Sequence, residues 1–325
     1  MGQITDSAWI QTVRGLIPAQ DLGFCHAHEH LFTSHDHAAR IDPALLLDSY
    51  ECTLAELELF KRAGGRGVVD AQPVGCGRRA DLLQRASEAS GVHVIASTGF
   101  HKLIYYPGDH WLHTASEEVL CELFLTELTE GMFLDGDHAF PRQKSSIRAG
   151  VIKAASDSAG ITPEYLRLFT AAGLAAKQTG VSVLTHTEKG AGALEQVELL
   201  LDLGLAPESI IVSHLDRGLD DFSYHVTVAQ TGVYLQYDTI GRPKYHSDRE
   251  EAEHILRMVE AGFAAQILLG LDSTRARMRS YGGDPGMDHI VVSFIPLLRQ
   301  VGVGIRDIEQ FTVGNPARAL SIKKA

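Results

Sequence analysis

Eight short apolar segments alternate with stretches of helical periodicity along this chain, and that alternation limits the possible folds more than any other feature. The segments lack the strict polar–apolar alternation of a half-exposed sheet, as expected for parallel strands that are buried on both faces. The expected strands are residues 23–30, 66–74, 92–98, 149–155, 181–187, 209–215, 233–240 and 266–272. Eight strands that alternate with helices are typical of a closed barrel, so we predict an α/β protein with a (β/α)8 TIM-barrel fold.

The stretches between these strands have the periodicity of amphipathic helices. They are residues 43–63, 80–90, 116–132, 162–178, 191–203, 220–230 and 247–261, with 287–300 after the last strand. Glycine or proline marks most of the returns from a helix to the next strand. No linker-like tract or charge block divides the chain, so we interpret residues 1–325 as a single domain. Residues 10–18 are expected to add a short N-terminal hairpin.

The charge of the chain limits its partners. The 325 residues have a net charge of -12, which argues against a nucleic-acid or membrane-surface partner because both select for basic faces. No apolar run reaches the length of a transmembrane helix, and the first residues lack a basic segment followed by an apolar core. We therefore expect a cytoplasmic protein that acts on a small molecule.

Several of the expected strands have a potential metal ligand at or next to their C-terminal ends. These residues are His28, His30, Lys153, His186, His214 and Asp272. The C-terminal ends of barrel strands form one rim, so these side chains are expected to converge there. His26, His28 and His30 alternate along the first strand and are expected to share a face. The two nearer the rim are the better ligand candidates, whereas His26 is more consistent with a hydrogen-bonded core histidine.

Lys153 and Asp272 each allow two interpretations. A lysine inside a parallel strand is rarely buried unpaired, so Lys153 could form an ion pair or extend its amine to solvent. Alternatively, a desolvated neutral amine could capture CO2 as a carbamate, whose two oxygens can bridge two cations. Asp272 could simply open a loop or cap a helix. Close to several imidazoles, it could instead bind a metal and accept a proton.

Taken in order, several motifs resemble the phosphotriesterase family of the amidohydrolase superfamily, which includes phosphotriesterase-like lactonases and phosphotriesterase homology proteins. The resemblance extends over most of the chain. The motifs are TVRGLIPAQDLGFCHAHEH from Thr12, AGVIK, THT, SHLD, LDSTRARMRSYGG and VGNPARAL from Val313.

This resemblance implies a binuclear metal hydrolase. The more buried ion would be bound by His28, His30 and Asp272, and the more exposed ion by His186 and His214. Carboxylated Lys153 and a hydroxide would bridge the two ions, and the hydroxide would attack the substrate while Asp272 acts as the catalytic proton acceptor. Nitrogen and oxygen ligands suit zinc and also manganese, cobalt or iron. The resemblance further implies a homodimer.

Two loop regions indicate the substrate. Members that act on hydrophobic lactones or organophosphates usually resemble one another in having Trp or Tyr shortly after the third strand, whereas this chain has His101 and Lys102 there. A polar substrate fits that difference better. The loops after strands seven and eight also contain clustered cations, namely Arg242, Lys244, Arg275, Arg277 and Arg279.

Clustered cations on an acidic chain suggest an anion site, and barrels often bind phosphate at these two loops. The alternative is solvated surface charge. We favour Lys244 and Arg275 as the anion ligands, with Tyr281 as a hydrogen-bond donor. The sequence thus predicts hydrolysis of a polar, phosphorylated furanose lactone or a related carboxylic ester. The competing hypotheses are a phosphotriester or phosphodiester hydrolase and a non-catalytic ligand-binding barrel.

Overall fold

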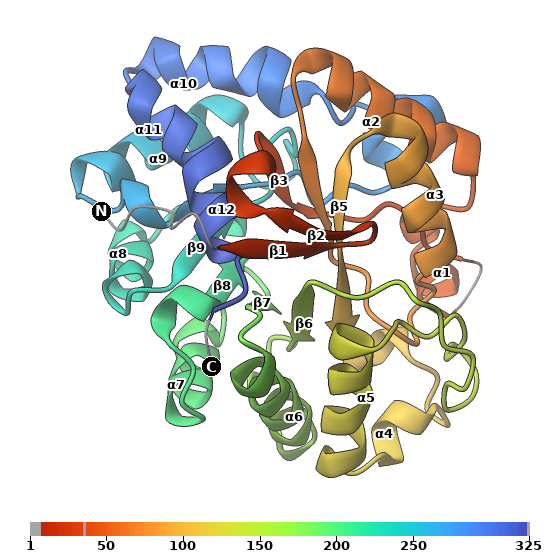
Figure 1. Cartoon of the computed structure of the whole chain (residues 1–325). Coiled ribbons are helices and arrows are strands. Elements are labelled where there is room, and N and C mark those ends of the chain that lie inside the picture. The colour runs from red at the N-terminus through yellow and green to blue at the C-terminus, as the bar shows by residue number, and fades with distance from the viewer. Residues whose placement is uncertain (1–7, 35–36, 324–325) are drawn as a thin grey trace.

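The computed structural model describes residues 8–34 and 37–323, so the N-terminal residues expected to lack a targeting signal lie partly outside it. Eight parallel strands, all hydrogen-bonded to their sequence neighbours, form the barrel at the centre of Figure 1. They are β3 (Cys25–Glu29), β4 (Gly67–Asp70), β5 (His93–Gly99), β6 (Val151–Ala155), β7 (Val183–His186), β8 (Ile210–Ser213), β9 (Tyr234–Tyr237) and β10 (Ile267–Leu269). Each falls inside an expected segment or overlaps it, and the (β/α)8 prediction is confirmed.

The barrel closes where β10 meets β3. The amide of Asp272 donates to the carbonyl of His28 at 3.0 Å, and the side-chain amide of Gln236 donates to the carbonyl of Ala27 at 2.6 Å. Gly270 allows this approach, because a Cβ there would lie 3.0 Å from the oxygen of His28. The closure therefore brings the first and last strands together at the rim where the candidate ligands lie.

Helices surround the strands (Figure 1). Those predicted between strands are α2 (Tyr50–Ala63), α3 (Ala80–Ser90), α5 (Glu117–Thr129), α6 (Pro163–Thr179), α7 (Ala193–Asp202), α8 (Phe222–Gln230) and α9 (Asp248–Glu260). Shorter ones are α1 (His37–Ile41), α4 (Trp111–Thr114), α10 (Ile295–Val301), α11 (Ile305–Glu309) and α12 (Asn315–Ala319). Among the described residues, no helix is long and apolar enough to cross a membrane.

Two of the predicted helices differ from the observed ones. The segment predicted at 43–63 divides, because Ser49 caps α2 by accepting a hydrogen bond from the amide of Cys52, while Pro43–Leu45 form a separate 3-10 turn. The segment predicted at 287–300 contains a π-helical turn, Ile290–Phe294, directly before α10. The N-terminal hairpin is present as β1 (Trp9–Thr12) and β2 (Gly15–Pro18), and it crosses one end of the barrel in Figure 1.

Apolar side chains fill the barrel below the rim. Ala27, Val69, Ile95, Val151, Leu184, Ile211 and Leu268 belong to one buried cluster. Residues two apart in a strand share a face, so Lys153 lies above Val151 and His186 above Leu184. Each of these strands therefore has an apolar residue inside the core and a polar residue at the rim.

The side chains of β3 do not alternate between inward and outward as predicted. His26 points outward, with its ring centroid 4.3 Å from that of Phe60 in α2 and its Nδ1 2.9 Å from the Glu29 carboxylate. The pairing of β3 with β4 shifts register between His26 and Glu29, which interrupts the alternation and lets His28 face inward. The expectation that His26 shares a face with His28 was wrong, whereas its interpretation as a buried core histidine is confirmed.

Candidate active site

The side chains predicted as ligands lie close together at the C-terminal rim of the barrel. One potential ligand atom from each of His28, His214 and Asp272 lies within 4.8 Å of the others. His30 is adjacent, with Nε2 3.5 Å from Oδ1 of Asp272. The Nζ atom of Lys153 lies 3.2 Å from Nε2 of His28. Residues in β3 and β6, and residues that follow β3, β8 and β10, thus meet in one place.

His186 completes this group from β7. Its ring centroid is 4.4 Å from that of His214, and its Nε2 lies 3.2 Å from Oε1 of Glu188. Burial lowers the pKa of His186 well below its usual value, and the nearby Lys153 amine adds to that effect. The ring is therefore neutral and can offer a nitrogen lone pair at neutral pH.

Two of these residues have an unusual backbone conformation. His214 and Asp272 have φ angles of 65° and 48°, in the left-handed region that non-glycine residues rarely adopt. Each such conformation costs about 1–2 kcal/mol. His214 directly follows β8 and Asp272 lies three residues after the end of β10, where the chain must turn while keeping the side chain at the rim. The local strain therefore coincides with the group of potential ligands, as is common at functional sites.

Buried acceptors fix the orientation of three imidazoles. Nδ1 of His28 lies 2.8 Å from Oε1 of Gln236, and Nδ1 of His30 lies 2.7 Å from Oε1 of Gln72. Nδ1 of His214 lies 2.6 Å from Oδ1 of Asp238. Because these oxygens are acceptors, each Nδ1 carries the proton and each Nε2 has a free lone pair.

The orientation of Gln236 is determined by its other contacts. Its Nε2 donates to the carbonyl of Ala27, so Oε1 must be the atom that accepts from His28, and the hydroxyl of Ser213 donates to the same oxygen. All of these groups are buried. Gln236 thus connects β9 with β3 and β8 while holding one imidazole in the tautomer that can bind a metal.

Lys153 is fully buried. Burial lowers the pKa of its amine to about 7, although the carboxylates of Asp272 and Asp238 oppose the change. A large fraction of the amine is therefore neutral at physiological pH and nucleophilic toward CO2. This burial excludes an amine that extends to solvent, which was one of the two forms of the first interpretation of Lys153.

Asp272 is held by two arginines. Its Oδ2 accepts hydrogen bonds from Arg217 and Arg242, each at 2.7 Å, while Oδ1 faces His30. Burial alone would raise the pKa of Asp272, but Arg242 and the contact with His30 outweigh that effect and hold the pKa well below its usual range. The carboxylate is therefore ionised, with one oxygen occupied and the other directed toward the histidines.

A cavity of about 200 Å³ opens above these residues. Four cationic side chains line it, namely Lys102, Arg217, Arg242 and Lys244. Lys102 pairs with Glu188, another lining residue, and Arg217 and Arg242 pair with Asp272. The lining is mostly polar, so the cavity suits a polar or anionic ligand better than an apolar one.

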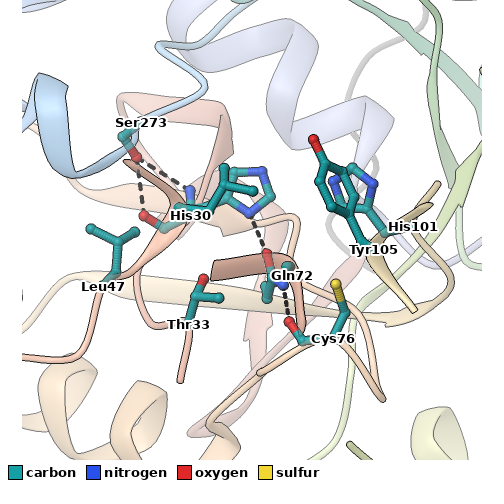
Figure 2. A pocket seen from close by; sticks show the side chains of 10 residues that line it. His30, Thr33, Leu47, Gln72, Cys76, His101, Tyr105 and Ser273 are labelled. Atoms are coloured by element: carbon teal, nitrogen blue, oxygen red, sulfur yellow. Dashed lines mark hydrogen bonds between the residues drawn. The ribbon is translucent and has the colours of Figure 1, made fainter. Parts of the chain in front are cut away.

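A smaller pocket, shown in Figure 2, adjoins His30. Its volume of about 20 Å³ is enough for one water molecule. Ser273 bonds to both the amide and the carbonyl of His30, while Gln72 connects the His30 ring to the carbonyl of Cys76. His101 and Tyr105 form the opposite side in Figure 2, with ring centroids 4.7 Å apart. The pocket therefore surrounds His30 with groups that fix its position.

The predicted substrate-binding residues divide into two groups. His101, Lys102 and Lys244 line the large cavity. Arg275 and Tyr281 are not part of its lining, in contrast to the prediction. Arg275 contacts Asp48 at 3.1 Å, and the hydroxyl of Tyr281 donates to the carbonyl of Ser49 at 2.8 Å.

The loop before α2 therefore provides the partners of Arg275 and Tyr281. Tyr281 also contacts the hydroxyl of Thr53 at 2.9 Å, so it fixes the start of α2 rather than facing the cavity. Arg277, another cation of this loop, bonds to the carbonyls of Ile240 and Gly241. These contacts attach the loop after β10 to its neighbours.

Sequence reasoning missed several residues of the site, namely Gln72, Glu188, Arg217, Gln236 and Asp238. Asp238 could have been found, because it directly follows β9 just as the predicted ligands follow or end their strands. Arg217 immediately follows the SHLD motif. The two glutamines had no comparable signal, since their role depends on which atom of the amide faces which imidazole.

Known proteins resemble this chain along almost its whole length. The sequence profile of the Phosphotriesterase family matches residues 8–320. A phospho-furanose lactonase from Mycoplasmopsis synoviae (strain 53) is 31% identical over 328 residues, covering 97% of this chain and 92% of that protein. The crystal structure of an amidohydrolase from Mycoplasma synoviae superposes with a TM-score of 0.94 at 30% identity, covering 98% of this chain and 93% of that one.

A third comparison concerns a bound ligand. The crystal structure of the phosphotriesterase homology protein from Escherichia coli, complexed with phosphate in its active site, superposes with a TM-score of 0.83 at 28% identity. It covers 92% of this chain and 98% of that one. The family match, the shared barrel and the group of potential ligands agree, and this chain therefore belongs to the phosphotriesterase family and is a hydrolase.

Proposed function

We propose that this protein uses two divalent metal ions to hydrolyse a polar, phosphorylated furanose lactone or a related carboxylic ester. The observation that carries the proposal is the convergence of neutral imidazoles, a buried lysine and an ionised aspartate beneath a cationic cavity. The relatives support the substrate class, because one is named a phospho-furanose lactonase and another has phosphate in its active site.

The residues at the rim fit a pair of metal ions. His28, His30 and Asp272 would hold one ion, and His186 and His214 the other. Their burial and the fixed tautomers leave lone pairs that are available without loss of a proton. Zn²⁺ is the ion we propose, and Mn²⁺, Co²⁺ or Fe²⁺ would satisfy the same nitrogen and oxygen donors.

Lys153 would take part as a carbamate. An unmodified amine offers one nitrogen and cannot bridge two cations, whereas a carbamate contributes two anionic oxygens at the same position. The pKa of about 7 keeps much of the amine neutral, which is the form that reacts with CO2. Carboxylation would also replace the contact between two nitrogens, Nζ of Lys153 and Nε2 of His28, with an oxygen donor set.

The chemistry divides between the ions and the protein. Two bound divalent ions would lower the pKa of a water molecule and polarise the ester carbonyl. Asp272 is ionised, and its Oδ2 is already occupied by Arg217 and Arg242. Oδ1 would therefore use one lone pair for the ion and the other to accept a proton. From this position it can pass the proton to the leaving oxygen of the opened ring.

The cavity provides recognition for an anionic substituent. Arg242 and Lys244 lie on the loop after β9 and line the cavity, together with Arg217 from the turn after β8. A guanidinium can bind a phosphate with two parallel hydrogen bonds, which gives orientation as well as affinity. We therefore assign the phosphate to Arg242 and Lys244, in place of the Arg275 and Tyr281 expected from sequence.

A substrate comparison tests this proposal. The protein, reloaded with Zn²⁺ in bicarbonate buffer, should hydrolyse a phosphorylated furanose lactone with a kcat/KM on the order of 10²-fold above that of the unphosphorylated lactone. Lys244→Ala should reduce that ratio, whereas Lys189→Ala, a substitution outside the cavity lining, should not. Faster turnover of an aryl phosphotriester than of any lactone would refute the substrate class. An absence of hydrolysis with any ester would favour the ligand-binding alternative.

A further inference from the structure

A second group of potential ligands lies outside the candidate active site. It consists of Asp216, His246 and Glu251, whose potential ligand atoms all lie within 4.8 Å of one another. Asp216 belongs to the turn after β8, His246 to the loop after β9, and Glu251 to the first turn of α9. His246 and Glu251 are five residues apart, on either side of the start of α9, whereas Asp216 lies on the turn after β8 and reaches them only in the folded chain.

The group is buried but incompletely partnered. Asp216 and Glu251 are fully buried, and the side chain of His246 is 7% exposed. Oδ2 of Asp216 accepts from the amide of Thr239 at 2.6 Å, and Oε2 of Glu251 lies 2.9 Å from Nε2 of His246. Among the described residues, nothing donates to Oδ1 of Asp216 or to Oε1 of Glu251. Buried oxygens without a donor are costly, so these two atoms indicate a missing partner.

A cation would also balance the charges of the group. Among the described residues, no lysine or arginine nitrogen lies within 4.0 Å of either carboxylate, and His246 is the one cationic candidate beside them. When both carboxyls are ionised, two buried negative charges face one imidazole, which leaves an excess of negative charge in a low-dielectric site. A divalent ion beside a neutral imidazole would balance that charge and occupy the two free oxygens.

From these observations we propose that Asp216, His246 and Glu251 bind a single divalent cation, separate from the two ions of the active site. Ligand atoms at about 2.1 Å from one ion lie at most about 4.2 Å apart, so the present group needs little contraction. Two carboxylates and one imidazole match the preferences of Mn²⁺ or Zn²⁺. His246 also lines a cavity of about 300 Å³, so one of the three side chains borders an open space.

Such an ion would connect the two loops that provide the cations of the active-site cavity. Arg217 directly follows Asp216, and Arg242 and Lys244 lie on the same loop as His246. The ring of Tyr245 contacts both Arg217, at 5.6 Å, and Lys244, at 4.8 Å from its centroid. The cation would thus have a positioning role, holding these loops at a fixed separation without touching the substrate.

Anomalous diffraction at the manganese edge tests the proposal directly, using crystals of the full chain soaked in MnCl2. The expected result is a peak in contact with Asp216, His246 and Glu251. An absence of density there at millimolar Mn²⁺ would overturn the inference. Peaks beside His28 and His214 are judged independently, so a failure of the two-metal proposal would be visible as a separate result.

A solution measurement covers the case in which crystals fail to form. Equilibrium dialysis against Mn²⁺ should show one ion per chain fewer for Glu251→Gln than for the parent. Glu253→Gln lies on the same helix with a side chain 54% exposed, and it should bind the parental number. Addition of Mn²⁺ should raise the midpoint of thermal unfolding less for Glu251→Gln than for the control. Equal stoichiometry in both variants would show that the two carboxylates share a proton instead.

Discussion

Replacement of Gln236 by leucine is expected to weaken metal binding, although Gln236 is not itself a potential ligand. The substitution removes the acceptor of His28 Nδ1, the acceptor of Ser213 and the donor to the Ala27 carbonyl. His28 can then adopt the other tautomer, in which Nε2 is protonated and cannot bind an ion. Loss of such an outer contact typically lowers metal affinity by about 10–100-fold. Asp238 lies 3.3 Å from the same Nδ1 and preserves part of the orientation, so a loss of about 10-fold is expected.

The same substitution should destabilise the fold. Three buried polar groups lose a partner, and each costs about 1–3 kcal/mol when no water replaces it. The appropriate control is Gln266→Leu. The side-chain amide of Gln266 also donates to the backbone, in its case to the carbonyls of Ala229 and Val233, but Gln266 precedes β10 and lies at the opposite end of the barrel. Both variants should unfold at lower urea concentration than the parent.

Competition with a chromophoric chelator measures the Zn²⁺ affinity of both variants. Gln236→Leu should bind Zn²⁺ about 10-fold more weakly than Gln266→Leu at comparable loss of stability. If the two variants retain equal affinity, the orientation of His28 does not depend on Gln236 and the reasoning is refuted. Partial unfolding cannot produce the expected difference, because the control is destabilised as well.

Three further predictions concern the buried charges. Lys153→Met should abolish hydrolysis, which a lactonase assay measures. The metal-free variant should nevertheless be at least as stable as the metal-free parent at pH 7, because methionine removes a buried amine. Urea unfolding measures this stability, and a less stable variant would contradict the expectation. The folded-state pKa of Lys153, about 7, lies below its ordinary value of 10.5, so the unfolded chain binds more protons between these values. The stability of the metal-free parent relative to Lys153→Met should therefore rise between pH 7 and 9, and an unchanged difference in unfolding free energy would contradict that sign. Arg78→Met should lower the free energy of unfolding by about 3–5 kcal/mol, since it leaves buried Glu127 without its cation, whereas Arg62→Met, at an exposed pair, should change it by less than about 1 kcal/mol.

Much of the barrel could be predicted from sequence because buried parallel strands and amphipathic helices have distinct periodicities. The convergence of residues from separate strands also followed from the fold alone, since all C-terminal strand ends meet at one rim. His28, Lys153 and His214 occupy that rim as expected. Their pattern is local in each strand and needs no knowledge of distant contacts.

The remaining differences arise from contacts that sequence spacing does not encode. The bulge in β3 lets His28 face inward although His26 points outward, and its position depends on the pairing with β4. Arg275 and Tyr281 lie on the expected loop. They form hydrogen bonds with Asp48 and Ser49 instead of lining the cavity. Arg217 was not recognised, because its partner Asp272 is 55 residues distant in sequence. The sequence therefore did not predict which side chains of the loops face the cavity.

The two guanidinium groups that share a single oxygen of Asp272 have a practical consequence. An anion that enters the cavity must compete with that carboxylate for Arg217 and Arg242, so bound sulfate or phosphate would weaken the hydrogen bonds that hold Asp272, the residue proposed to transfer the proton. Buffers containing such anions would then inhibit in two ways, by filling the recognition site and by altering the acid–base behaviour beneath it. Kinetic comparisons between laboratories will depend on the counter-ion as much as on the metal supplied.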